Sequence, residues 1–256
     1  MLIDSHAHLD MEDYANDIEE VLDRALRGGI SHIIAVGIDM PSSIKALELA
    51  ERYDFIYSTV GFHPHNADDV DISNIDDLIS LASGSKKVVA WGEIGLDFYR
   101  NYARVQSQIE IFELQMDKAL ELDLPVIIHD REAHDDVLRI VRKRKDMEQK
   151  GVIHCFSGDY DLAMAFIDLG FYISIPGTVT YKNAVKTQDV AARMPIERML
   201  IETDAPFLSP IPERGKRNEP LFVRHTAQKI AQLRNMDFEE LALQTSLNAK
   251  RLFGLP

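Results

Sequence analysis

The sequence predicts an α/β fold, a single (β/α)8 barrel of the TIM type that spans residues 1–256 and carries an extra helix at its C-terminal end. Short β-branched runs alternate with longer amphipathic runs, a pattern typical of repeated βα units around a parallel sheet. Eight such strands are found, and no linker, repeat or low-complexity tract divides the 256 residues. Barrels of this kind typically have about 250 residues.

The eight strand candidates are apolar runs bounded by polar residues, glycine or proline. They lie at 2–6, 32–36, 56–60, 88–92, 126–129, 152–154, 171–175 and 199–201. An open doubly wound sheet is the alternative, but it favours a Gly-x-Gly-x-x-Gly turn after the first strand, and the sequence has none there.

The helix candidates follow these strands and show apolar residues at helical spacing. The first carries Ile18, Val21 and Leu22 and ends at Gly28-Gly29. The others lie at 41–52, 76–82, 105–122, 133–145, 162–169, 183–193 and 220–233, and 238–252 is the extra C-terminal helix.

Composition limits the kind of protein. At 46% apolar residues the chain can bury a large core, and no apolar run approaches the roughly 18 residues of a membrane span. The start of the chain lacks the features of a signal peptide, and a single cysteine fits a reducing compartment, so we expect a cytoplasmic protein. No obligate protein partner is expected. A net charge of −14 argues against a broad grip on nucleic acid, so any such role needs a local cationic patch and metals.

Histidines and acids recur where the predicted strands end. In a barrel the carboxyl ends of the strands converge on one face, so residues distant in sequence meet there. His6 and His8 share one side of the first strand because side chains alternate along a strand. The candidate metal ligands at these strand ends are His6, His8, Glu93, His129, His154 and Asp204.

Four histidines and two carboxylates exceed what one tetrahedral catalytic ion needs, and they suit two ions about 3.5 to 4 Å apart. Glu93, on the strand between the two histidine groups, is the predicted bridge. We assign His6, His8 and Asp204 to the first ion, and His129 and His154 to the second. Imidazole with carboxylate favours Zn, Mn, Fe or Ni over Ca. Asp204 is expected to help deprotonate the attacking water.

Three residues near these ligands are predicted to support catalysis. His63, in Gly61-Phe-His-Pro64, is expected to donate a proton to the leaving oxygen or to hold a phosphate; its alternative is a loop-capping histidine. Glu202 is expected to orient a ligand histidine or the attacking water. Arg131, two residues after His129, is expected to point toward the same mouth and hold substrate.

The loop after the eighth strand is a candidate anion site. Arg214, Lys216 and Arg217 place three cations in four residues, close in sequence to Asp204, where they could clamp a phosphate. The alternative is an ordinary solvated loop. Cys155 is expected to be buried and inert, because neighbouring residues on a strand point to opposite faces. Asp4 is expected to be a structural hydrogen-bond partner of the turn after the first strand.

Seven motifs in order carry a resemblance to a known family. They are Asp4-Ser-His-Ala-His-Leu9, Gly61-Phe-His-Pro64, Gly92-Glu-Ile-Gly-Leu-Asp97, Pro125-Val-Ile-Ile-His-Asp-Arg131, His154-Cys-Phe-Ser-Gly158, Glu202-Thr-Asp-Ala-Pro206 and Arg214-Gly-Lys-Arg-Asn-Glu-Pro220. Across the whole chain the sequence resembles the TatD family of metal-dependent deoxyribonucleases, within the amidohydrolase-like barrel enzymes. Many amidohydrolases bridge their metals with a carboxylated lysine from the fourth strand, and Glu93 in that place favours the TatD type.

The resemblance implies hydrolysis of DNA phosphodiester bonds, often as a 3′ to 5′ exonuclease on single strands, with Mg or Mn supporting activity. The leading hypothesis is therefore a two-metal deoxyribonuclease whose substrate is DNA. One rival is a small-molecule hydrolase that cleaves a lactone, amide or phosphoester with the same metals, since one barrel hosts many chemistries. The other is a metal-binding scaffold without activity.

Overall fold

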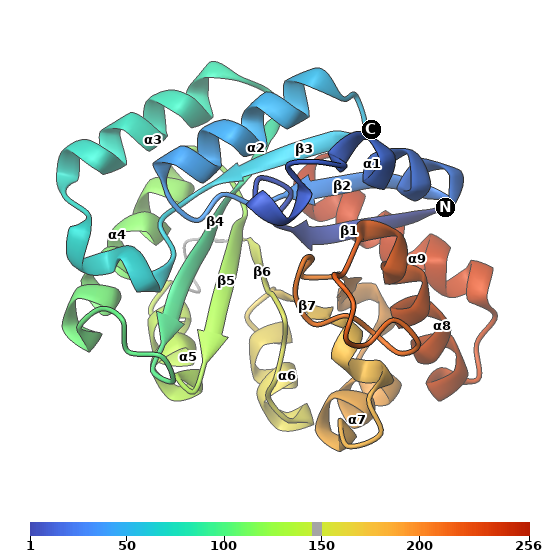
Figure 1. The fold of residues 1–256 in the computed structure, drawn as a ribbon. Helices are drawn as coiled ribbons and strands as arrows, with labels where there is room; N and C mark the ends of the chain where they lie inside the picture. Colours follow the sequence, from blue (N-terminus) through green and yellow to red (C-terminus); the bar gives the residue numbers. More distant parts are fainter. Residues whose placement is uncertain (145–149) are drawn as a thin grey trace.

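The computed structural model describes residues 1–144 and 150–256 and shows a ring of parallel strands enclosed by helices (Figure 1). The strands pair in chain order from β1 to β8, which confirms the predicted barrel. They are β1 (Leu2–Ala7), β2 (Ile30–Ala35), β3 (Ile56–Val60), β4 (Val88–Asp97), β5 (Val126–Arg131), β6 (Gly151–Ile153), β7 (Tyr172–Ile175) and β8 (Met199–Ile201).

The ring closes between β1 and the segment after β8. Ala7 and Ala205 form an isolated parallel bridge, the His8 amide donates to the Ala205 carbonyl at 2.7 Å, and the Asp204 amide donates to the His6 carbonyl at 3.0 Å. These bonds join the candidate ligands His6, His8 and Asp204 directly through the backbone. Closure of the barrel therefore positions one side of the candidate site.

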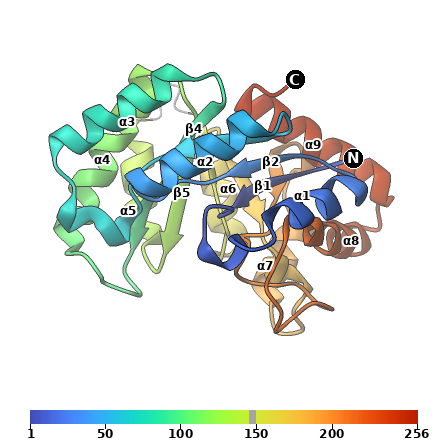
Figure 2. The same cartoon turned by 45° about the horizontal axis from the view of Figure 1, so that its top comes forward.

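The helices cover the outside of the ring, with α1 against β2 and α2 against β2 and β3 (Figure 2). They are α1 (Ile18–Arg27), α2 (Met40–Arg52), α3 (Ile72–Gly84), α4 (Val105–Glu121), α5 (His134–Arg142), α6 (Tyr160–Ile167), α7 (Val185–Arg193), α8 (Val223–Arg234) and α9 (Phe238–Phe253). Among the described residues, no helix is both long and apolar enough to cross a membrane.

Some helix boundaries differ from the prediction. The helix expected at 76–82 begins four residues earlier, because Asp71 and Asn74 form a reciprocal capping box. Pro220–Phe222 is a 3-10 turn, so α8 starts at Val223. The predicted end of the 133–145 helix, at residue 145, lies outside the described residues.

The predicted extra helix, α9, packs at the opposite end of the barrel from the strand carboxyl ends. Its Leu252 and Phe253 join one apolar cluster with Ile3, Ile127 and Leu200. Since β1 and β5 lie half a ring apart, these strand residues meet inside the barrel. The Asn248 side-chain amide also donates to the carbonyl of Met199, the first residue of β8, at 2.9 Å. The amino-terminal end is thus closed, and the open end carries the polar residues.

Strand β4 is longer than predicted and reaches Asp97, with a register shift against β5 between Trp91 and Ile94. Gly95 permits this course. Its φ is +140°, and a Cβ built there would lie 2.0 Å from the His129 carbonyl oxygen. Only glycine allows the two strands to approach so closely, and the contact is with the backbone of a candidate ligand.

Replacing Gly95 by alanine is expected to destabilise the fold by about 2 to 4 kcal/mol, because the new methyl group combines backbone strain with overpacking. Chemical denaturation measures the loss. Gly84→Ala is the matched control: a Cβ there meets nothing within 4 Å at the end of α3, so stability should stay level or rise. Equal stability of the two variants would contradict the close approach.

Candidate metal centre

A cavity of about 630 Å³ opens at the carboxyl ends of the strands. Its floor and walls hold a cluster of buried ionisable side chains; His8 is 4% exposed, Glu93 3% and His154 5%. The cavity is lined by His8, His63, His65, Glu93, Asp97, Arg100, Tyr102, His129, Arg131, His154, Cys155, Asp204 and Phe207, among others. The predicted convergence of sequence-distant residues is therefore present.

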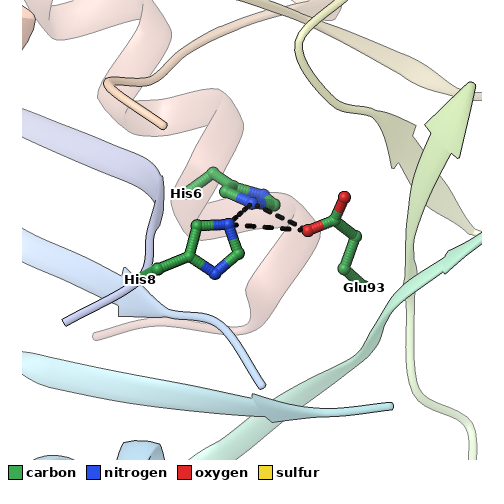
Figure 3. A group of neighbouring side chains, drawn as sticks. All are labelled: His6, His8 and Glu93. Carbon is green, nitrogen blue, oxygen red and sulfur yellow. Dashed lines mark hydrogen bonds and ion pairs between the residues drawn. The ribbon is translucent and has the colours of Figure 1, made fainter. Parts of the chain in front are cut away.

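The first group forms around one oxygen of Glu93. Glu93 Oε2 lies 3.3 Å from His6 Nε2 and 3.6 Å from His8 Nε2, and Figure 3 shows both rings turned toward it. Asp204 Oδ1 lies 3.7 Å and 3.4 Å from the same two nitrogens. The two Nε2 atoms are themselves 3.2 Å apart. Four potential ligand atoms thus face a common point.

The second group forms around the other oxygen of Glu93. Oε1 lies 2.7 Å from His129 Nδ1 and 2.8 Å from His154 Nε2, which are 3.3 Å from each other. The two groups also touch, since the rings of His6 and His154 stack with centroids 4.0 Å apart. Each Glu93 oxygen therefore faces its own pair of imidazoles.

The charges in the cluster depend on one another. Burial raises the pKa of Glu93, but the facing charge of His154 and its other histidine neighbours outweigh burial and hold this pKa well below its usual range. Burial lowers the pKa of His154, yet Glu93 and Glu202 raise it well above the ordinary value. Protons on histidines thus compensate the buried carboxylates.

Divalent cations fit the same arrangement. Neutral imidazole nitrogens and carboxylate oxygens are the donors that transition metals prefer, and a cation can replace the protons that otherwise balance the carboxylates. Three overlapping groups have donor atoms within 4.8 Å of one another: His6, His8 and Glu93; His6, His154 and Glu202; and His63, Glu93 and His129. His and Glu side chains are therefore positioned to bind metal.

His63 approaches the second group, with Nε2 3.4 Å from Glu93 Oε1. Its Nδ1 accepts a hydrogen bond from the His65 amide at 3.2 Å, so the neutral ring carries its proton on Nε2. Burial lowers the pKa of His63 to about 4. The neutral ring lines the cavity with its Nε2 proton directed toward the second group, and its Nδ1 caps the turn after β3. Donation to a leaving oxygen stays a prediction.

The predicted phosphate clamp after β8 does not reach the cavity. Arg217 forms an ion pair with Asp17 at 2.6 Å, and Lys216 pairs with Glu213 at 2.7 Å. Arg214 lies over the ring of Tyr181, with Cζ 4.6 Å from its centroid. None of the three cations lines the cavity. That prediction is corrected, because nearby carboxylates and the Tyr181 ring engage these side chains. Arg131, in contrast, lines the cavity as expected.

Two further expectations change in detail. Cys155 does not alternate away from His154, because β6 ends at Ile153 and Cys155 has a φ of +45°, so it lines the cavity. Burial raises the pKa of its thiol well above the usual value, which agrees with an inert thiol. Asp4 is a structural partner, but of the segment after β8: its carboxylate accepts from the Thr203 amide at 2.9 Å and from the Thr203 hydroxyl at 2.6 Å.

Comparison with known proteins agrees with this geometry. The family model described as "TatD related DNase" matches residues 3–254. The chain belongs to the TatD-related DNase family. A "Uncharacterized metal-dependent hydrolase YabD" of Bacillus subtilis is 45% identical, with complete coverage of both chains. A "3'-5' ssDNA/RNA exonuclease TatD" of Salmonella typhimurium is 35% identical and is covered over 98% of both chains.

A solved structure of the family shares the fold. The TatD homolog YJJV from Escherichia coli superposes with a TM-score of 0.94 at 32% identity, over 100% of this chain and 98% of that one. Family membership and the buried His and Glu cluster agree: the protein is a TatD-related metal-dependent hydrolase.

In this TatD-related chain, Asp97 and His65 are site residues that sequence reasoning missed. Asp97 Oδ2 lies 2.8 Å from His65 Nε2 and 3.4 Å from His129 Nε2. Its Oδ1 accepts from the amides of Tyr99 and Arg100 at 2.9 and 2.8 Å. The signal was available, since Glu93 and Asp97 are four residues apart on one strand and such positions share a face.

Glu202 takes the matching place behind the other histidine of the second group. Its Oε1 lies 3.5 Å from His154 Nδ1 and accepts from the Cys155 amide at 2.6 Å. This favours the predicted role in orienting a ligand histidine over a role in orienting water. Asp97 and Glu202 thus each place a carboxylate behind an imidazole, the arrangement that fixes the tautomer and direction of metal-binding histidines.

Asp97→Asn is expected to weaken binding of one metal equivalent about 10- to 100-fold, because the amide nitrogen would face ring nitrogens in place of a carboxylate oxygen. Calorimetric titration with Mn or Zn measures this, and the other equivalent should keep its affinity. Asp189→Asn, which removes an exposed partner of Arg193, is the control and should change neither. Unchanged titration of Asp97→Asn would contradict the positioning role.

Proposed function

We propose that the protein hydrolyses phosphodiester bonds of single-stranded DNA, removing nucleotides from the 3′ end, with two divalent metal ions. One ion is assigned to His6, His8 and Asp204, the other to His129 and His154, and Glu93 bridges them. The proposal rests on how the two carboxylate oxygens of Glu93 are placed. Oε2 lies 3.3 and 3.6 Å from one pair of imidazole nitrogens, and Oε1 lies 2.7 and 2.8 Å from the other pair.

Two facts support single-stranded DNA as the substrate. The cluster lies among buried side chains of the cavity, and a site recessed in this way favours a strand that is already unpaired, because a paired one must first be opened to reach it. Relatives from Salmonella typhimurium and Erwinia amylovora, 35% and 37% identical, carry the name "3'-5' ssDNA/RNA exonuclease TatD". A cytoplasmic location fits the single cysteine.

When bound, two divalent ions would polarise the phosphoryl oxygens and lower the pKa of water, which is the chemistry of two-metal phosphodiesterases. Mg or Mn is proposed for activity, and Zn, Ni or Fe also suit the donors. Asp204 lies at the edge of the first group and takes the proton of the attacking water. His63 donates its Nε2 proton as a hydrogen bond to the leaving oxygen. Arg131 holds a phosphate at the mouth.

The direct test uses metal-stripped protein on DNA labelled at either end, with Mg, Mn or Zn restored. We expect metal-dependent loss of single nucleotides from the 3′ end of single strands and much slower loss from a blunt duplex. Release from the 5′ end would overturn the proposed direction. A protein that holds two ions per chain but cleaves no strand would overturn the nuclease.

A small-molecule hydrolase is the second candidate, and the net charge of −14 favours it because an acidic surface repels polynucleotides. Strand length separates the two. A nuclease gains kcat/KM as oligonucleotides lengthen from two residues, because further nucleotides add contacts, whereas a small-molecule enzyme shows no gain and turns over lactones, amides or simple phosphoesters.

A further inference from the structure

Two exposed aromatic side chains stand on opposite sides of the cavity mouth. Tyr102 follows β4 and Phe207 follows β8, and strands four apart in a ring of eight lie half a barrel from each other. Both residues line the cavity, yet Tyr102 is 66% exposed and Phe207 48%. Large aromatic side chains are usually buried, so rings left open at the rim of a polar cavity are available to a ligand.

Each ring lies beside a different half of the metal centre. The Phe207 ring is 6.0 Å from the ring of His8, which belongs to the first group. The Tyr102 ring is 4.7 Å from that of His65, and His65 shares Asp97 with His129 of the second group. Glu93 lies between the two groups. A phosphate held there would have one aromatic ring on each side.

Positive charge gathers on the Tyr102 side of the mouth. The guanidinium groups of Arg131 and Arg100 lie over the ring of Tyr99, with Cζ 4.3 and 5.7 Å from its centroid. Both arginines line the cavity, and within residues 1–144 and 150–256 neither forms an ion pair. In a chain with a net charge of −14, two unpaired cations at one rim complement a phosphate.

Hydrogen bonds and an ion pair anchor the chain at Phe207 and close to Tyr102. The Phe207 amide donates to the Asp204 carbonyl at 2.9 Å, and the buried Asn218 amide donates to the Phe207 carbonyl at 2.6 Å. On the other side, Arg104 pairs with Asp68 at 2.9 Å just after Tyr102. Rings on pre-positioned loops lose little conformational freedom when they bind.

We infer that Phe207 and Tyr102 stack on the bases of the two nucleosides that flank the scissile phosphate, and that Arg100, with Arg131, holds the next phosphate on the Tyr102 side. The inference rests on the proposed function and deepens it, because the site then selects unpaired nucleotides rather than small phosphoesters. Stacking tolerates any base, since every base has a π face, so little sequence preference is expected.

The test combines alanine substitutions in the protein with abasic residues in the substrate. Oligonucleotides carry a single abasic residue at the terminal or the penultimate position, on either side of the scissile bond. Each abasic residue should lower kcat/KM of the wild-type protein roughly 10- to 100-fold, the loss expected for one stacked base. Phe207→Ala and Tyr102→Ala should each cause a similar loss of kcat/KM on normal DNA. For each variant, one of the two abasic positions should then cause no further loss, because the ring that stacked on that base is already gone. The insensitive position should differ between the two variants.

Conservative variants separate stacking from folding. Phe207→Tyr and Tyr102→Phe keep a ring and should keep near wild-type kcat/KM, while Leu243→Ala removes an exposed side chain of α9 outside the cavity and should change nothing. Stacking would be overturned if the wild-type protein cleaved abasic and normal strands equally well. It would also be overturned if the loss caused by each alanine substitution multiplied with the loss caused by every abasic position. Either result would leave the proposed nuclease activity intact. Wild-type protein that cleaves no strand at all would remove both proposals.

Discussion

Glu93→Gln is expected to lower DNA hydrolysis by about 10³-fold or more, since loss of one preorganised electrostatic group already costs about 10²- to 10³-fold and Glu93 serves both proposed ions. Its carboxylate has one oxygen within 2.8 Å of His129 and His154 and the other 3.3 Å from His6. Glutamine keeps one of these oxygens and puts an NH2 group where the second should accept. Metal analysis of purified protein should show loss of more than one equivalent per chain.

Glu213→Gln is the matched control, because this carboxylate pairs with Lys216 outside the cavity. It should retain wild-type metal content and turnover. The thermal midpoint of both variants must be compared, since a misfolded Glu93→Gln protein would also be inactive. A folded Glu93→Gln protein that keeps two ions and full activity would disprove the bridging assignment.

Removal of metal by a chelator is expected to abolish hydrolysis completely, and restoring two equivalents of Mg, Mn or Zn should recover it. Stability should fall as well. An ion at 100 times its Kd contributes about 2.7 kcal/mol to folding, which corresponds to roughly 5 to 10 °C in Tm for a chain of this length. Differential scanning calorimetry before and after metal removal measures the shift. A Tm that is the same with and without metal would contradict a buried metal centre.

Metal uptake should also release protons. Burial lowers the pKa of His8 and of His129, but nearby carboxylates outweigh burial. Asp204 and Glu93 raise the pKa of His8 above the ordinary 6.5. Asp97 and Glu93 do the same for the pKa of His129. A histidine with a raised pKa stays protonated to higher pH and must lose that proton to bind metal. Apparent metal affinity is therefore expected to rise with pH through the neutral range, as titration in buffers of different ionisation enthalpy would show.

Much of this protein follows from local sequence patterns. Strands 56–60 and 199–201 occur where predicted, because β-branched runs bounded by polar residues leave few alternatives. The candidate ligands were found for a similar reason: the side-chain alternation of a strand and the shared carboxyl end of parallel strands require that such residues meet. Only the family resemblance, confirmed by the match over residues 3–254, extended this to a class of enzyme.

What the sequence could not decide depends on contacts between distant segments. Lys216 and Arg217 were expected at the mouth, but Glu213 and Asp17, the latter 200 residues from Arg217, hold them elsewhere. Which oxygen of Glu93 faces which histidines, and the placement of Tyr102 opposite Phe207, follow from closure of the ring. Periodicity specifies which face of a strand a residue occupies, whereas side-chain direction and charge pairing are set by neighbours that only the folded chain brings together.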